Sequence, residues 1–157
     1  MSISLQRILV PMDFSEHTDM ALITAHHLAD HLGAELRLLH VVEPLRSMGI
    51  SNYGHEICRN WEVSQKEAAE ELMHKACDAI PLPADRRDFR TVSGRPADAI
   101  PAVAKEDGVD LIVLPTHGRS GLEQLVVGSV AERVVRNAHC PVLTLKPFGR
   151  PLAVEAR

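Results

Sequence analysis

The chain has 157 residues, enough for a single domain with a substantial hydrophobic core. Its formal net charge is −4 and it carries no basic cluster, which argues against nucleic acid as a partner. It contains no run of about 18 or more apolar residues and no signal-peptide pattern, so we expect a cytoplasmic protein that does not bind membranes. Aromatic residues make up only 3%, so Leu, Val, Ile and Ala must build the core, as in a parallel sheet covered by helices.

The first third of the chain predicts a strand, a helix and a second strand. Residues 7–12 are a short apolar run that ends at Asp13, and Ser15 is suited to cap a helix that Gly33 terminates. Apolar side chains recur at spacings of three and four on that helix, at Ala21, Leu22, Ala25, Leu28, Ala29 and Leu32. Residues 35–42 read as the second strand.

Residues 44–60 have no clear period and contain two glycines, so we expect a long loop of the kind that is often functional. Ser64 and Glu67 form a capping-box pattern, and Pro81 and Pro83 end the helix that follows. The inward side of this helix is predicted to carry Ala69, Leu72, Met73, Ala76 and Ile80.

The remaining pattern repeats the alternation of strand and helix. We expect strands at residues 88–93, 110–114 and 141–145, and helices at 96–105 and 129–138, the first of them kinked by Pro101. Such alternation implies right-handed crossovers and a doubly wound parallel sheet. Ligands bind such sheets beyond the carboxyl ends of the strands, where the strand order reverses. If the first and fourth strands are neighbours, that point lies between Asp13 and Pro115.

A glycine-rich segment connects the fourth strand to the last helix: it begins with Pro115-Thr-His-Gly-Arg-Ser-Gly121 and ends with Gly128-Ser129. Its glycines can adopt positive φ, and backbone N–H groups at the helix start can converge on an anion, so we predict a phosphate-binding loop. The spacing matches neither a P-loop, nor a dinucleotide fingerprint, nor a nucleophile elbow. The alternative is a connection whose glycines only serve turns.

Five motifs follow one another in order: Ile8-Leu-Val-Pro-Met-Asp-Phe-Ser15, Leu39-His-Val41, Val92-x-Gly94-x-Pro96, Thr116–Gly121 with Gly128–Arg133, and His139-Cys-Pro-Val-Leu143. Together they resemble the universal stress protein family over residues 6–146, within a single domain of residues 1–157 whose tail, 147–157, we expect to be mobile. The resemblance implies a five-stranded parallel α/β sheet of order 3-2-1-4-5 and a homodimer through the last strand. In one branch of the family it implies ATP or ADP, with or without Mg²⁺, as a switch ligand.

That branch carries Gly-x2-Gly-x9-Gly-Ser/Thr, which Gly118, Gly128 and Ser129 match, whereas Pro115 replaces the first glycine. Proline has no N–H and a fixed φ. One lost hydrogen bond weakens binding by up to about tenfold. We therefore expect weakened rather than abolished nucleotide binding, and keep open a dimeric interaction protein that binds no nucleotide.

The resemblance also assigns roles by position. Pro11 and Asp13 resemble the adenosine-side wall, and Val41 resembles a residue whose backbone meets the adenine edge. Asp13 could instead cap the first helix or hold a turn. Ser129 could bind phosphate or cap the last helix, and Arg119 could reach a phosphate or lie in solvent. The complete predicted site comprises Pro11, Asp13, Val41, Leu114, Pro115, Gly118, Arg119, Gly128, Ser129 and Val130.

Other candidates are weaker. His27 and His31, four residues apart on a predicted helix, could bind a metal from one face but lack a third ligand. His117 lies within the loop, where bracing is favoured over catalysis. The three cysteines are widely spaced without a Cys-x-x-Cys pair, which argues against disulfides and zinc, and Cys58 in the expected loop is a candidate redox sensor. A true hydrolase lacks an evident base, so ATP turnover would be slow at most.

Overall fold

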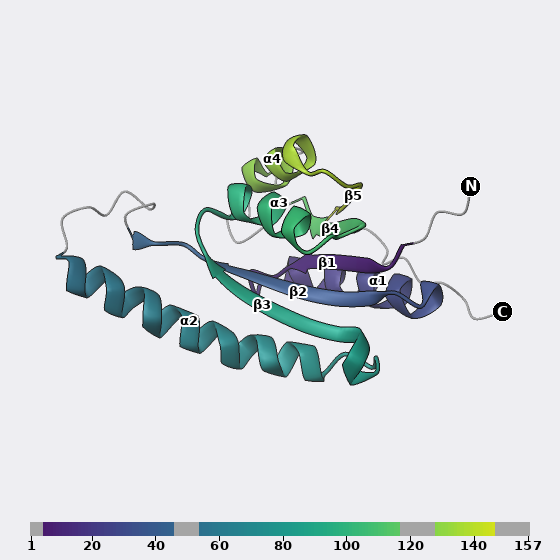
Figure 1. Ribbon diagram of the computed structural model, residues 1–157, viewed down its shortest axis with the longest axis horizontal. Helices are drawn as coiled ribbons and strands as arrows, with labels where there is room; N and C mark the ends of the chain where they lie inside the picture. Colours follow the sequence, from purple (N-terminus) through teal and green to yellow (C-terminus); the bar gives the residue numbers. More distant parts are fainter. Residues whose placement is uncertain (1–4, 46–53, 117–127, 147–157) are drawn as a thin grey trace.

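The computed structural model describes residues 5–45, 54–116 and 128–146. Five parallel strands form one sheet in the order β3-β2-β1-β4-β5, as the sequence predicts (Figure 1). β1 lies at the centre, hydrogen-bonded to β2 on one side and to β4 on the other. The strands are β1 (Arg7–Pro11), β2 (Glu35–Val42), β3 (Arg87–Ser93), β4 (Leu111–Pro115) and β5 (Val142–Leu145).

Helices cover both faces of the sheet, because the apolar strands have no polar face to expose. Ile8 and Val10 point into the core cluster beneath α1 and α2, whereas Leu9 points into the cluster beneath α3 and α4. None of these three side chains is exposed. The helices are α1 (Glu16–Leu32), α2 (His55–Asp78), α3 (Pro96–Glu106) and α4 (Ser129–Asn137), with a short 3-10 turn, η2 (Ala84–Arg86), before β3.

Small side chains let α1 lie close to the sheet. Ala21, Ala25 and Ala29 are fully buried, which confirms the predicted inward stripe over most of the helix. Leu32 was expected in the same stripe but is 47% exposed, because it is the last residue of α1, beside the turn at Gly33. Gly33 has φ of 70°, so it ends the helix in the left-handed conformation that the sequence predicts.

The helix α2 differs most from expectation. It begins at His55, well ahead of the capping box at Ser64, so the predicted loop over residues 44–60 is wrong from residue 55 onward. Among the described residues of α2 before Ser64, only Cys58 is buried, whereas Ile57 and Trp61 are 55% and 39% exposed. The sequence therefore shows no apolar periodicity that would indicate a helix there. α2 is the long helix at the bottom of Figure 1.

The inward stripe of α2 is also rotated relative to the prediction. Ala69, Met73 and Cys77 are buried at spacings of four, so Leu72 falls beside the stripe and is 45% exposed. Ile80 lies beyond the end of α2 but is buried, as predicted. α3 continues through Pro101, which is itself buried.

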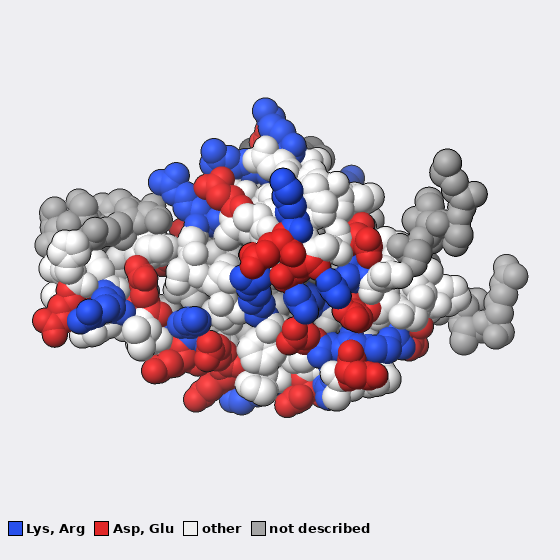
Figure 2. Space-filling view, in the orientation of Figure 1, with Lys and Arg blue, Asp and Glu red and all other residues white. Residues whose placement is uncertain are grey.

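Charged side chains of both signs alternate across the face shown in Figure 2. The best-connected group joins β2, β3 and the end of α3: Arg37 lies 2.8 Å from Asp107 and 3.0 Å from Asp88, and Arg90 lies 3.0 Å from Asp107. Within this group, two arginines and two aspartates therefore neutralise one another. None of the described helices is long and apolar enough to cross a membrane. The tail predicted to be mobile, residues 147–157, lies outside the described residues.

Arg86 on η2 secures the end of α1 and gives a test of the fold. Its guanidinium donates to the carbonyl oxygens of Ala29 at 2.6 Å and Ala34 at 2.9 Å, so it joins the last turn of α1 to the residue that precedes β2. We expect Arg86→Met, which keeps the apolar stem, to lower the free energy of unfolding by about 1.5–3 kcal/mol in urea titrations. Arg136→Met is the control, because Arg136 pairs with Glu132 on an exposed surface, where such a pair contributes about 0.5 kcal/mol. Equal effects of the two variants would contradict this role of Arg86.

Candidate functional site

The carboxyl edge of the sheet opens between its two central strands. In the described strands, the β1–β4 ladder pairs Ile8 with Leu111 and Leu9 with Ile112 and ends there. The residues that follow on the two strands, including Pro11 and Pro115, are therefore not held together by the ladder. From β1 the chain adds β2 and β3 on one side of the sheet, and then adds β4 and β5 on the other side. The strand order therefore reverses between β1 and β4. A doubly wound sheet binds its ligands there.

Asp13 directly follows β1 and is held in one orientation by the start of α1. Its Oδ1 atom accepts hydrogen bonds from the N–H of Ser15 at 3.0 Å, the hydroxyl of Ser15 at 2.6 Å and the hydroxyl of Thr18 at 3.2 Å. Ser15 occupies the N-cap position as predicted, but its side chain makes no capping bond to the helix. Asp13 therefore has the turn-holding role that the sequence left open, and this role fixes the carboxylate at the sheet edge.

Phe14, the next residue, has φ of 60°, the one positive φ at a non-glycine position in the described chain. A left-handed conformation costs an L-residue about 1–2 kcal/mol, and it is unusual for a bulky side chain. The Phe14 ring packs against the His40 ring of β2, with 4.7 Å between centroids. The sequence offers no signal for this conformation, because glycine or asparagine would be expected at such a position.

Three of the predicted site residues meet on the α3 and α4 side of the sheet. Leu114 is buried within the core cluster there, and Val41 and Val130 pack against that same cluster while remaining partly exposed. Pro11 is half-buried at the end of β1, paired in register with Leu39. The structure thus brings an apolar lining from β2, β4 and α4 to one side of the carboxyl edge.

Hydrogen bonds tie the end of β4 to the start of α4. Pro115 is the buried last residue of β4 and pairs in register with Leu145 of β5. Thr116 donates its N–H (2.8 Å) and its hydroxyl (3.2 Å) to the carbonyl of Leu145, and its own carbonyl accepts from Gly128 N–H at 2.7 Å. Both ends of the connecting segment are therefore anchored. The predicted residues Gly118 and Arg119 lie in that segment, outside the described residues.

The start of α4 departs from the prediction in detail. We expected Gly128 to adopt a positive φ, but its φ is −58°, which other residues also adopt. Its N–H donates to the carbonyl oxygen of Thr116. Gly128 is the N-cap and Ser129 is the first helical residue, so the capping alternative for Ser129 is wrong. Among the residues that the structure describes, no side chain caps this helix. Helix geometry gives the N–H groups of Ser129, Val130 and Ala131 no partner within α4, and these are the groups that can bind an anion.

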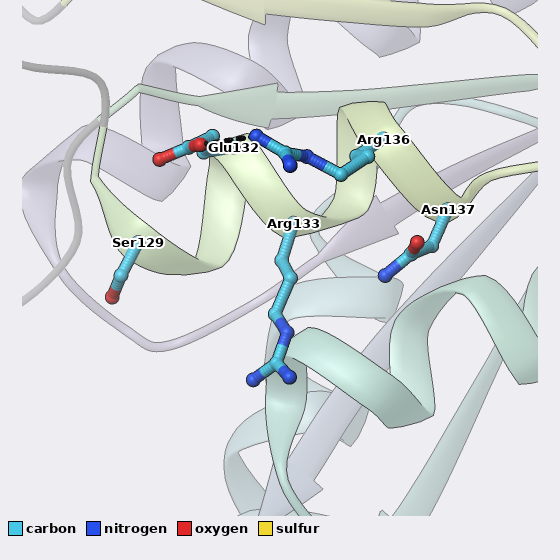
Figure 3. A pocket seen from close by; sticks show the side chains of 5 residues that line it. All are labelled: Ser129, Glu132, Arg133, Arg136 and Asn137. Carbon is cyan, nitrogen blue, oxygen red and sulfur yellow. Dashed lines mark hydrogen bonds and ion pairs between the residues drawn. The ribbon is translucent and has the colours of Figure 1, made fainter.

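A surface hollow of about 510 Å³ runs along α4 (Figure 3). Its described lining is Ser129, Glu132, Arg133, Arg136 and Asn137, and Glu132 pairs with Arg136 at 2.8 Å. These residues lie on the outer side of α4, whereas Ala131 and Val134 are its buried residues. The hollow therefore begins at Ser129 but lies outside the apolar lining, so we base the site on the sheet edge rather than on the hollow.

The described histidine and cysteine candidates do not form a site. No group of three potential metal ligands occurs among the described residues, which leaves His27 and His31 without a third ligand. Cys58 is buried on α2 rather than exposed in a loop. Burial raises the pKa of Cys77 and of Cys140, which keeps both as unreactive thiols at neutral pH.

The fold defines a doubly wound α/β protein whose strand order reverses between β1 and β4. The model of the universal stress protein family matches residues 4–146, so the chain belongs to that family. A universal stress protein of Methanocaldococcus jannaschii is 33% identical over 144 residues, 90% of this chain and 82% of that protein. One of Thermus aquaticus is 34% identical over 140 residues, 88% of this chain and 97% of that protein. UspA from Lactobacillus plantarum has a solved structure with a TM-score of 0.78 and 25% identity, over 92% of this chain and 99% of that one.

Two solved structures of this fold contain adenine nucleotides. A universal stress protein in complex with cAMP has a TM-score of 0.68 and 22% identity over 92% of this chain and 99% of that one. The universal stress protein of Archaeoglobus fulgidus in complex with dAMP has a TM-score of 0.62 and 21% identity over 90% of this chain and 98% of that one. At these identities the likeness shows the shared fold.

The three contacts on Asp13 Oδ1 predict a measurable contribution to stability. We expect Asp13→Ala to lower the free energy of unfolding by about 2–3 kcal/mol, because hydrogen bonds to a charged group are lost. Asp13→Asn keeps a carbonyl oxygen as acceptor, so it should cost about 1 kcal/mol. Asp30→Ala, at an exposed position of α1, is the control and should change stability by less than about 0.5 kcal/mol in the same urea titration. A loss as small for Asp13→Ala as for the control would show that the turn does not depend on this carboxylate.

Proposed function

We propose that this universal stress protein binds an adenine nucleotide, ATP or ADP, at the carboxyl edge between β1 and β4, and uses it as a switch ligand in a stress response. The observation that carries the proposal is the uncapped start of α4, placed by the Gly128–Thr116 hydrogen bond directly beyond the end of β4. N–H groups that have no partner within the helix, together with the positive end of the helix dipole, favour phosphate at this place.

The adenosine half of the ligand fits the neighbouring residues. Val41 is partly exposed on the α3 and α4 side of the sheet and offers an apolar surface for the base, with the buried Leu114 in the same cluster and Pro11 at the end of β1. Asp13 lies beyond β1, where Ser15 and Thr18 hold it in a fixed orientation, and its carboxylate is an acceptor of the kind that a ribose hydroxyl needs. Mg²⁺ would arrive with the phosphates of ATP as part of the ligand. We propose switching rather than rapid hydrolysis, with slow ATP turnover at most.

Pro115 favours the second candidate, a family member that binds no nucleotide. This residue has no N–H to offer a ligand. However, Pro115 ends β4 in register with Leu145, so the proline is accommodated within the sheet. The first-turn amides of α4 do not depend on it. Weakened binding therefore remains our proposal.

We further propose a cytoplasmic homodimer that pairs through β5. β5 is the last strand of the sheet, so its outer side has no strand partner among the described residues. Ile112 N–H bonds to Pro141 O and Thr116 N–H bonds to Leu145 O, so alternation turns the N–H and C=O of Val142 and Thr144 outward. Antiparallel pairing of two such edges across a two-fold axis would satisfy both.

Calorimetry with ATP and Mg²⁺ tests the nucleotide proposal. We expect binding by the unchanged protein, and binding up to about tenfold tighter by Pro115→Gly if the missing donor weakens the site. Unchanged affinity in Pro115→Gly would mean that the proline costs nothing. No heat with millimolar ATP for either protein would contradict the proposal and favour the candidate without nucleotide.

The dimer proposal is tested on the backbone of β5. Thr144→Pro removes an outward N–H and spares the ladder to β4, so we expect a folded monomer in sedimentation at micromolar concentration, with unchanged circular dichroism. Thr144→Val keeps the N–H and the branched shape and should remain dimeric. A charge at Leu143 would be less specific, because that side chain packs against the core cluster beneath α1. A folded, dimeric Thr144→Pro protein, or a monomeric unchanged protein, would overturn pairing through this strand.

A further inference from the structure

The strained turn after β1 needs forces that hold it. Phe14 is a bulky residue at φ of 60°, and it directly follows Asp13, the residue proposed to face the ribose. A non-glycine residue keeps such a conformation only where its surroundings determine it. Strain of this kind is found most often at ligand sites.

His40 of β2 supplies two of these restraints. Its Nδ1–H donates to the carbonyl oxygen of Met12 at 2.7 Å, and its ring packs against the Phe14 ring at 4.7 Å with 33° between the planes. Because a carbonyl can only accept, this contact also fixes the proton on Nδ1. His40 thus contacts the residue before Asp13 and the residue after it.

A third contact comes from the backbone of the same strand. Met12 N–H donates to the carbonyl oxygen of Leu39 at 2.7 Å, so β2 holds the turn through two successive residues. Asp13 is held on its other side by Ser15 and Thr18. The turn that carries the carboxylate is therefore held by β2 on one side and by the start of α1 on the other.

His40 cannot act by touching a base that lies against Val41. Side chains alternate along a strand, so the His40 ring lies on the α1 and α2 side of the sheet, beside Phe14, whereas Val41 packs on the α3 and α4 side. Any influence of His40 on the ligand must pass through the turn.

We propose that His40 is a positioning residue of the nucleotide site: it holds the Met12–Phe14 turn in its strained conformation and thereby aims Asp13 at the ribose hydroxyls. The inference rests on the proposed function and assigns ribose selectivity to a side chain that does not contact the ligand. The loss of His40 should therefore weaken recognition of the ribose and spare that of the phosphates.

The test compares ATP with 2′,3′-dideoxy-ATP, which lacks both ribose hydroxyls. His40→Phe keeps a ring against Phe14 but removes the Nδ1–H donor. We expect it to weaken ATP binding by about tenfold, the equivalent of one hydrogen bond, and to change binding of the dideoxy analogue by less than about twofold. His40→Asn restores an N–H near the position of Nδ1 and should recover ATP affinity to within about threefold.

His74→Phe is the matched control, because the His74 ring also packs edge-on against a phenylalanine, Phe89, at 4.9 Å, but on α2 and the start of β3. It should leave both affinities unchanged. Hydrogen exchange of the Asp13 and Phe14 amides gives a readout without nucleotide and should quicken in His40→Phe but not in His74→Phe.

Each result decides between the proposals. Equal losses for ATP and the dideoxy analogue in His40→Phe, or unchanged exchange at Asp13 and Phe14, would overturn the positioning role while leaving nucleotide binding intact. If His40→Phe does not fold, the same comparison is made with His40→Leu, which also removes the Nδ1–H donor, with the same expectation. No ATP binding by the unchanged protein would overturn the proposed function, and the role of His40 with it.

Discussion

The burial of β1 on both faces is the constraint on which the rest of the structure depends. Ile8, Leu9 and Val10 are completely withdrawn from water, and each such side chain contributes about 1.5–3 kcal/mol of favourable burial. A strand buried on both faces must have helices above and below it and strands on both sides. That requirement brings the carboxyl ends of β1 and β4 together at one edge and directs the start of α4 to the same edge. The place of the proposed ligand site thus follows from covering the central strand.

The strands and helices follow local conformational preferences, whereas the β1–α1 turn does not. The strands and the alanine-rich face of α1 satisfy every local preference: apolar runs are buried, and Gly33 adopts the left-handed conformation that glycine tolerates best. The β1–α1 turn goes against local preference, because Phe14 has a positive φ, as Gly33 does, but lacks the conformational freedom of glycine. Departures from local consistency concentrate at functional sites, and this one lies beside Asp13. The rigid sheet beneath it makes the strain tolerable.

The sequence predicts the fold well because its signals are local and strong. Apolar runs bounded by Gly, Pro and capping residues locate all five strands, and their alternation with helices leads to the parallel sheet. It misses the first turns of α2, where Ile57 and Trp61 face solvent and no period emerges. It predicts that Gly128 and Ser129 lie at the start of α4, but not that the Gly128 amide is used by Thr116. It cannot reveal the contact between Phe14 and His40, because pairing across strands depends on register rather than on neighbours in sequence.

The Thr116 contacts have a consequence for how the protein can change over evolutionary time. Because Thr116 joins Leu145 on one side and Gly128 on the other, the chain between Thr116 and Gly128 begins and ends at fixed points. The entropy of closing such a loop grows only with the logarithm of its length, by about 0.6 kcal/mol for each doubling. Insertions, deletions and substitutions between the two anchors therefore cost the sheet little. Ligand preference can diversify between relatives while the core around β1 stays under selection for packing.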